Sequence, residues 1–234
     1  LSSYDFGATP IFNCLGLRDY FRTQGLFPDS DPGLVFHPSI DIARYASLKR
    51  SVRPRRRLAF YGRPEVSRNL FPTGLAALDR FLTETGLRPD EIELVSVGLA
   101  HEHVSLTGGH VLRSLGKIPW SDYPRFLADT DVGLSLMLSP HPSHPPIEMA
   151  AAGARVVTNA FAGKDLSDLS PAIQSSDPTP EALSRALQGA WYSPPVANEE
   201  RRIDLTDLGR PLREVVSALS ERVSDSNIRQ LRHA

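Results

Sequence analysis

The chain has 234 residues, of which 41% are hydrophobic and 23% charged, and its formal net charge is −1. This length permits one large domain or two small ones, and the near-zero charge argues against a protein that coats nucleic acid. The single cysteine, Cys14, excludes an internal disulfide framework and a cysteine-based zinc site, which indicates a reducing, cytoplasmic setting.

Neither membrane spans nor targeting signals are visible in the sequence. No run approaches the roughly 18 apolar residues of a spanning helix, and residues 1–10 lack both an initiator methionine and a signal-peptide pattern. We therefore expect a fragment or a trimmed chain. Any peripheral association with a membrane is expected to go through parts outside this chain.

The predicted elements of the first third are short. Residues 13–25 (NCLGLRDYFRTQG) predict an amphipathic helix, residues 34–38 (LVFHP) a strand, and residues 41–48 one or two helical turns. Residues 50–57 (RSVRPRRR) then carry five arginines. Such a run can bind phosphates or an anionic membrane surface, but charge runs are usually solvated, so we interpret it as a solvated linker.

Strands and helices alternate from residue 58 onwards. Apolar runs predict strands at 58–61, 93–97, 111–117, 132–138 and 155–160. Apolar periodicity predicts helices at 71–85, 121–129 and 180–192, and a final helix from about 211 to 223 or 231. Thr73 is a candidate helix cap, Pro180 fits a first helical turn, and Trp191 and Tyr192 are expected to pack. The alternation predicts an α/β fold with one doubly wound, mostly parallel Rossmann-like sheet.

Several catalytic fingerprints are missing. No GxGxxG, GxxxxGK[ST] or GxSxG motif occurs, so a dehydrogenase, a P-loop ATPase and a serine hydrolase are all unsupported. His101, Glu102, His103 and His110 suggest a metal site, but adjacent positions on an extended chain diverge. A plain surface loop is the favoured interpretation.

Two polar loops follow predicted strands. Residues 139–153 (SPHPSHPPIEMAAAG) follow one strand and lead into a helix, and Gly62-Arg63 follows another, with Arg68 five residues on. Open α/β sheets form ligand crevices at such carboxyl ends. An arginine pair suits a diphosphate, and Glu148 near a helix start suits vicinal ribose or sugar hydroxyls, with the helix amides adding positive charge. A surface role for Arg68 and a helix-capping role for Glu148 fit equally well.

These residues resemble a known family. Gly62-Arg63, the basic residue at 68 and the motif at 146–153 (PIEMAAAG) resemble the carboxyl-terminal donor-binding domain of GT-B glycosyltransferases of the large group 1. FYGRPEVSRNLF and LSPHPSHPPIEMAAAGARVVTNAF are similar to rhamnosyltransferases that build bacterial surface and S-layer glycans from dTDP-rhamnose, and HPSID and NCLGLRDYF fit that group. The resemblance covers residues 13–191.

The resemblance implies roles by position. Arg63 and Arg68 would hold the donor diphosphate and stabilise the leaving nucleotide electrostatically, and Glu148 would accept hydrogen bonds from the ribose hydroxyls. Lys117 and Ile118 would line the base pocket. The full set of implied substrate-binding residues is Gly62, Asn69, Lys117, Ile118, Ser139, His141, Ser143 and His144. Turn-forming surface roles fit His141 and His144 equally well.

Two departures from the family pattern bear on function. Many relatives carry two glutamates eight positions apart, the earlier one in the sugar-facing loop. Glu148 corresponds to the later glutamate, and the position eight residues before it is Pro140 in this chain. The acceptor-binding amino-terminal domain is also not recognisable in the chain. We expect residues 1–45 to be a segment linking to that domain, 46–195 to be the nucleotide-sugar donor domain, and 196–234 to be a helical segment that crosses back.

The resulting hypothesis is a hexosyltransferase that transfers a sugar, rhamnose by resemblance, from a dTDP-sugar to a cell-surface glycan acceptor. It is expected to need no metal or other cofactor, to bind no nucleic acid, and to work in the cytoplasm at the inner face of the membrane. Without a separate acceptor domain it is expected to be inactive. The alternatives are a non-catalytic nucleotide-sugar-binding or interaction module and, less favoured, a nucleotide-sugar epimerase.

Overall fold

The computed structural model describes residues 9–26 and 33–232, with side chains described up to residue 223. The chain divides into two compact units, Leu1–Ser39 with Leu205–Ala234, and Ile40–Asp204. The predicted donor-binding domain, residues 46–195, lies inside the second unit. Each unit is described by itself.

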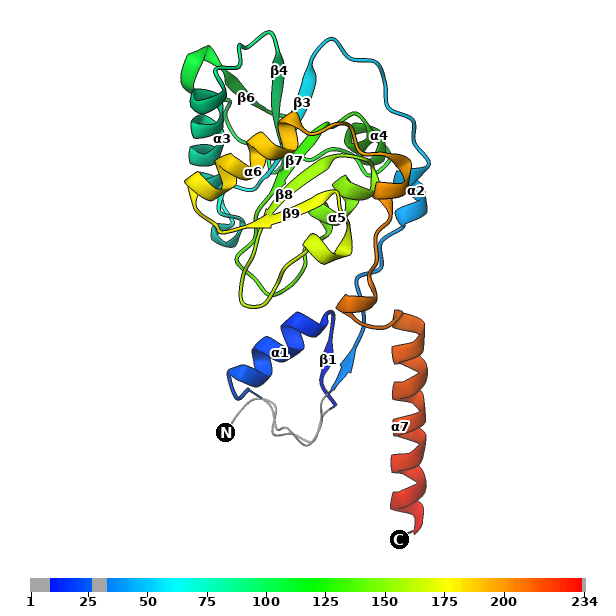
Figure 1. Cartoon of the computed structure of the whole chain (residues 1–234). Coiled ribbons are helices and arrows are strands. Elements are labelled where there is room, and N and C mark those ends of the chain that lie inside the picture. The colour runs from blue at the N-terminus through cyan, green and yellow to red at the C-terminus, as the bar shows by residue number, and fades with distance from the viewer. Residues whose placement is uncertain (1–8, 27–32, 233–234) are drawn as a thin grey trace. The chain divides into compact units, whose positions relative to one another are not determined.

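The second unit is built on a seven-stranded sheet with the order β5-β6-β4-β3-β7-β8-β9. All pairs are parallel except β5 with β6, which confirms the predicted α/β fold with a mostly parallel sheet (Figure 1). The strands are β3 (Arg56–Gly62), β4 (Ile92–Gly98), β5 (Val104–Ser105), β6 (Val111–Ser114), β7 (Val132–Ser135), β8 (Arg155–Asn159) and β9 (Ile173–Ser176).

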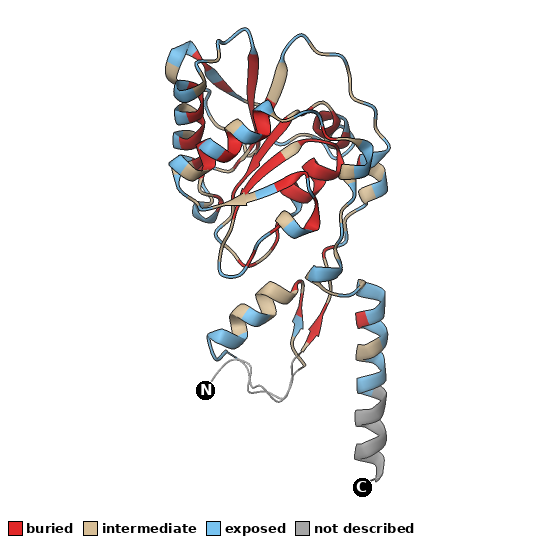
Figure 2. Cartoon of the chain, in the orientation of Figure 1, coloured by how far each residue is buried: buried red, intermediate tan, exposed pale blue. Residues whose placement is uncertain are grey.

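The central strands are buried on both faces because their sequences are nearly all apolar. Leu58, Ala59 and Phe60 of β3 are fully buried, and they pair with β4 on one side and β7 on the other. Continuous apolar runs of this kind are typical of parallel strands covered by helices on both faces. Figure 2 shows the result, with the buried strands enclosed by helices that expose only their outer surfaces.

Helices cover both faces of this sheet. α3 packs against α6 on one face, where the Phe81 and Trp191 rings meet edge to face with their centroids 6.1 Å apart. α5 packs against α2 and α4 on the other face. The helices are α2 (Ile42–Ala46), α3 (Phe71–Thr85), α4 (Tyr123–Ala128), α5 (His144–Ala151) and α6 (Pro180–Tyr192), with 3-10 turns η1 (Ser67–Asn69), η2 (Thr107–Gly109), η3 (Ser167–Leu169) and η4 (Asn198–Arg201).

Several local predictions are wrong in instructive ways. Thr73 does not cap α3, because Leu70 occupies the cap position in a left-handed conformation and Pro72 lies in the first turn. Tyr192 is 65% exposed, whereas Trp191 is buried as predicted. The edge strand β9 was not predicted, since its sequence IQSS has too little apolar character to indicate a strand.

Several arginines of the arginine-rich segment form ion pairs with residues of the sheet unit. Arg53 and Arg57 both form ion pairs with Glu93 of β4, with Arg57 Nε 2.9 Å from Glu93 Oε2. Arg50 donates to Asp131 Oδ1 at 2.8 Å. The prediction of a solvated linker is therefore only partly right, because Val52, Pro54 and Arg55 are exposed whereas the paired arginines attach the segment to the sheet.

The described part of the first unit contains a two-stranded parallel sheet and two α-helices. Phe12 and Val35 of this sheet are buried together, and Cys14 caps the first helix by accepting from the Leu17 N–H at 3.3 Å. In the final helix Val215 is buried, whereas Val216 is exposed. No helix of the described residues is long and apolar enough to cross a membrane. The elements are β1 (Ile11–Phe12), α1 (Leu15–Thr23), β2 (Leu34–Val35), η5 (Thr206–Leu208) and α7 (Leu212–Arg232).

Candidate functional site

A hollow of about 440 Å³ lies where chain segments leave the carboxyl ends of β3, β4, β6 and β7. This is the edge at which doubly wound sheets bind ligands. Five of the residues implied by the family resemblance line it together, although they are up to 85 positions apart in sequence. They are Arg63, Lys117, Ile118, His144 and Glu148.

Glycines end β3 and β4 beside this hollow, and Gly98 belongs to its lining. A Cβ on Gly62 would lie 2.3 Å from Ser96 Oγ, and a Cβ on Gly98, whose φ is +126°, would lie 2.8 Å from the Gly62 carbonyl oxygen. The Leu99 N–H donates to that same carbonyl at 3.1 Å. The two strand ends approach this closely only because both side chains are absent. Arg63, which directly follows Gly62, belongs to the lining of the hollow.

Glu148 lies in the middle of α5 rather than at its start, which corrects the prediction. Its side chain is only 7% exposed, and its Oε1 accepts a hydrogen bond of 3.0 Å from the Tyr45 hydroxyl. Burial raises the pKa of Glu148 above its ordinary value, and the Tyr45 hydrogen bond and the nearby His144 oppose that rise. Glu148 is held by Tyr45 at Oε1 and belongs to the lining of the hollow.

Three tyrosines missing from the predicted site belong to it. Tyr61 and Tyr123 line the hollow beside Glu148, and Tyr45 of α2 bonds to Glu148 from behind. The Tyr123 hydroxyl oxygen is buried and has no hydrogen-bond partner among the described residues. Burial and then the Glu148 charge raise the pKa of Tyr123. Sequence spacing could not identify Tyr45, since 103 positions separate it from Glu148.

The start of α5 offers few backbone donors. The second and third helical residues, Pro145 and Pro146, have no N–H, and the Ser143 N–H already donates to His141 Nδ1 at 3.0 Å. Of the first-turn amides, that of His144 remains. The prediction that helix amides supply positive charge here is thus weakened, and side-chain cations become the main positive groups.

The other predicted residues lie beside this hollow and do not line it. The Ser139 hydroxyl accepts from the His141 N–H at 3.1 Å, and the His141 ring stacks on that of His144 at 6.3 Å. Burial is the main cause that lowers the pKa of His141, and His144, Lys164 and Arg68 add to it. The Asn69 amide donates to the Leu136 carbonyl at 3.0 Å.

These contacts separate structural from ligand-facing roles. Asn69 is fully buried and fastens the loop after β3 to the end of β7, as does the Leu138 N–H, which donates to the Arg68 carbonyl at 2.7 Å. Ser143 lies between the loop residues Ser139 and His141 and the hollow-lining residue His144. Its φ of +64° is a strained value for a residue with a side chain. His144 connects this loop to the hollow, since it lines the hollow and stacks on His141.

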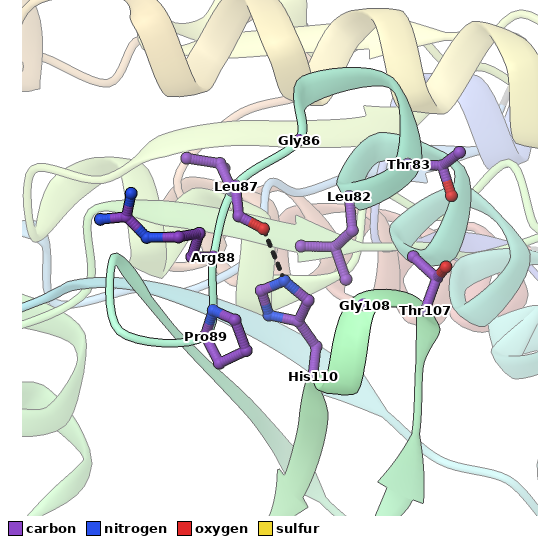
Figure 3. Close-up of a pocket in the computed structure, with 9 residues that line it drawn as sticks. All are labelled: Leu82, Thr83, Gly86, Leu87, Arg88, Pro89, Thr107, Gly108 and His110. Carbon is purple, nitrogen blue, oxygen red and sulfur yellow. Dashed lines mark hydrogen bonds between the residues drawn. The ribbon is translucent and has the colours of Figure 1, made fainter.

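The histidines of residues 101–110 go to separate partners. His101 Nε2 lies 2.8 Å from Ser96 Oγ, His103 Nδ1 accepts from the Ser114 N–H at 3.1 Å, and His110 Nε2 lies 2.8 Å from the Leu87 carbonyl oxygen. Among the described residues, no group of three potential ligands could hold a metal ion. His110 instead lines a second hollow of about 420 Å³ (Figure 3), which lies at the amino ends of β4 and β6 and contains no predicted site residue.

Comparisons with known proteins agree on one family. Residues 56–188 match the family model described as "WsaF, C-terminal domain". The chain is 35% identical over 161 residues to the O-antigen biosynthesis protein RfbC of Myxococcus xanthus. The aligned region covers 67% of this chain but only 12% of that protein. The chain thus spans about an eighth of the length of this curated relative.

Solved structures share the fold at low sequence identity. An α,α-trehalose 6-phosphate synthase from Burkholderia multivorans matches with a TM-score of 0.61 at 15% identity, over 82% of this chain and 52% of that one. A glycosyltransferase from Rickettsia africae gives 0.60 at 13% identity, over 79% and 53%. The structure described as "Trehalose-6-phosphate from E. coli bound with UDP-2-fluoro glucose" gives 0.56 at 16% identity, over 72% and 45%. In each case the chain covers about half of the solved protein.

Proposed function

The chain belongs to the family of the WsaF C-terminal domain, and from this premise we propose that it is the donor-binding half of a glycosyltransferase that builds a cell-surface glycan. The observation that carries the proposal is the single hollow that gathers Arg63, Lys117 and Glu148 at the carboxyl edge of the sheet. A relative named for O-antigen biosynthesis and a similarly folded protein bound to UDP-2-fluoro glucose support a nucleotide-sugar donor.

The charges of the hollow suit the two ends of a nucleoside diphosphate. Arg63 and Lys117 supply permanent positive charge for the diphosphate, with Arg68 close by, and Glu148 supplies acceptor oxygen for the ribose hydroxyls. As the bond between sugar and diphosphate breaks, negative charge grows on the leaving nucleotide. Fixed cations lower that barrier because they are in position before the charge develops.

Side chains have to supply this charge because α5 starts with two prolines. Few amides are left there to bind a phosphate, so Arg63 and Lys117 take over the role that backbone donors have at other helix starts. We propose that these cations balance the leaving diphosphate without a bound metal ion.

The proposed donor is dTDP-rhamnose and the proposed acceptor a growing surface polysaccharide. The motifs around residues 60–71 and 137–161 support a rhamnosyl group, and Pro140 supports a sugar with fewer hydroxyls. Proline has no side-chain acceptor, so the side chain at that position cannot bind a sugar hydroxyl as a glutamate would. A 6-deoxy sugar such as rhamnose has one hydroxyl fewer to satisfy.

A donor screen by thermal denaturation tests the proposal. Ligand present at 100 times its Kd stabilises by about 2.7 kcal/mol, which for a chain of this size raises the Tm by roughly 5–10 °C. We expect that rise with dTDP and dTDP-rhamnose, a smaller one with UDP- and GDP-sugars, and none for Arg63→Ala. Arg88→Ala, an exposed arginine at the amino edge of the sheet, is the matched control and keeps the rise. Absence of a shift with every nucleotide would refute the proposal.

A second candidate, a non-catalytic nucleotide-sugar-binding module, is favoured by Pro140 alone. It shares the binding predictions and differs in turnover. Transfer of rhamnose by a protein that contains this chain together with its acceptor domain would reject the module, and binding without transfer in the same protein would support it.

A further inference from the structure

Trp120 differs from the other tryptophan of the chain in its surroundings. It is 66% exposed and lines the hollow, whereas Trp191 is 4% exposed in the core. An indole left in water costs free energy that packing would recover, so a large exposed aromatic at the rim of a hollow indicates an unfilled contact.

Trp120 is nevertheless held in place. The Arg44 guanidinium lies over its ring, with Cζ 4.9 Å from the ring centroid, and Arg44 Nη2 donates to the Trp120 carbonyl at 3.2 Å. The backbone of Arg44 is also fixed, since its main-chain N–H donates to the Asp41 carboxylate that caps α2 at 3.0 Å. A guanidinium covers one face of an indole and leaves the other available.

The walls near Trp120 match a flat, largely apolar group. Val97, Leu99 and Ile118 line the hollow together with this tryptophan, and the ionic groups Arg63 and Glu148 belong to the same lining. A nucleoside diphosphate has parts that match these groups: a planar base for the apolar residues, a diol for Glu148 and a diphosphate anion for Arg63. The diphosphate has no planar face to stack, and the base is the aromatic part of this ligand.

We propose that Trp120 is the stacking surface for the nucleobase of the donor, and that Arg44 is the positioning residue that orients its ring. This inference rests on the proposed function, since it assigns one more residue to the same site. It makes a distinct claim, however, because it concerns the base alone. Ligands without a base bind independently of Trp120.

The experiment compares dTDP with inorganic pyrophosphate by isothermal titration of the whole chain. We expect Trp120→Ala to weaken dTDP binding by about 10- to 100-fold, the range of one base–aromatic stack, and to leave pyrophosphate binding unchanged. Trp120→Phe retains a ring and stays within about 5-fold of the parent. The matched control is Tyr192→Ala, since Tyr192 is 65% exposed on α6 and lies outside the lining of the hollow.

Fluorescence gives a second readout that needs no variant. Acrylamide quenches exposed tryptophans, so the quenchable signal of the parent comes from Trp120, and dTDP but not pyrophosphate is expected to protect it. Equal dTDP affinity in parent and Trp120→Ala, with circular dichroism showing both folded, overturns the inference and leaves the proposed function standing. Failure of the parent to bind dTDP overturns both.

Discussion

Replacing Tyr45 with phenylalanine removes one hydroxyl from the interior and keeps the ring that packs there. Tyr45 is 1% exposed, and its hydroxyl donates to Glu148 Oε1 at 3.0 Å. A hydrogen bond to a charged group contributes about 1.5–3 kcal/mol, and a carboxylate that is 7% exposed has little water to replace it. We therefore expect the free energy of unfolding at pH 8 to fall by about 1.5–3 kcal/mol, or roughly 3–12 °C in Tm.

The dependence on pH identifies the cause. Burial raises the pKa of Glu148 above its ordinary value of 4.5, so its ionisation destabilises the folded chain as the pH rises through the folded pKa. The Tyr45 hydrogen bond opposes this effect by stabilising the ionised form. Below the ordinary value the carboxyl is protonated in both folded and unfolded states. The cost of Tyr45→Phe should then shrink toward the roughly 0.5–1.5 kcal/mol of a neutral hydrogen bond.

Urea denaturation followed by circular dichroism, at pH 8 and at pH 4, measures this cost in four chains. They are the parent, Tyr45→Phe, Glu148→Gln and the double variant. We expect the Tyr45→Phe cost to be small at both pH values in the Glu148→Gln background, because no charge is left to stabilise. Tyr192→Phe serves as the exposed control and stays within about 0.5 kcal/mol of the parent. A cost that is equal at both pH values and in both backgrounds would refute the reasoning.

Three further predictions concern other parts of the second unit. Glu93→Gln should lower the free energy of unfolding by about 2–4 kcal/mol in urea denaturation, because it leaves Arg53 and Arg57 without their carboxylate, and a loss under 0.5 kcal/mol would contradict this role. Gly74→Ala should destabilise by about 1–3 kcal/mol despite the better helix propensity of alanine, because the new Cβ would lie 2.2 Å from Phe60 Cζ; a more stable variant would show that the core yields there. Pro145→Ala restores an N–H at the start of α5 and should tighten pyrophosphate binding by about 2- to 5-fold in calorimetry, whereas weaker binding would argue against an anion at that place.

The sequence predicted best those elements whose signals are local. The helix from Pro180 to Tyr192 was predicted with its observed bounds, since proline in the first turn marks its start. The strands that precede Arg63 and the loop leading to Glu148 were predicted from apolar runs. β9 was missed because an edge strand with three of its four residues polar has no pattern that distinguishes it from a loop.

The candidate site was predictable only in part for a related reason. Arg63, Lys117 and Glu148 follow strands, and parallel topology brings such positions to one edge. Tyr45 and Arg44 precede the sheet and reach the site through tertiary packing of α2, which no spacing encodes. The arginine-rich segment shows the converse. Its composition predicts exposure to solvent, but several of its arginines pair with Glu93 and Asp131, which are 36 or more positions away in sequence.

The two contacts of α2 have a thermodynamic consequence. A five-residue helix has little stability of its own, so α2 persists because adjacent residues, Arg44 and Tyr45, hold Trp120 and Glu148. Any ligand that fixes Trp120 and Glu148 therefore also lowers the free energy of the ordered helix. By reciprocity, any change that destabilises α2 weakens the binding of that ligand. Slower amide hydrogen exchange of α2 in the presence of a nucleotide that never touches it would report occupancy of the hollow from outside.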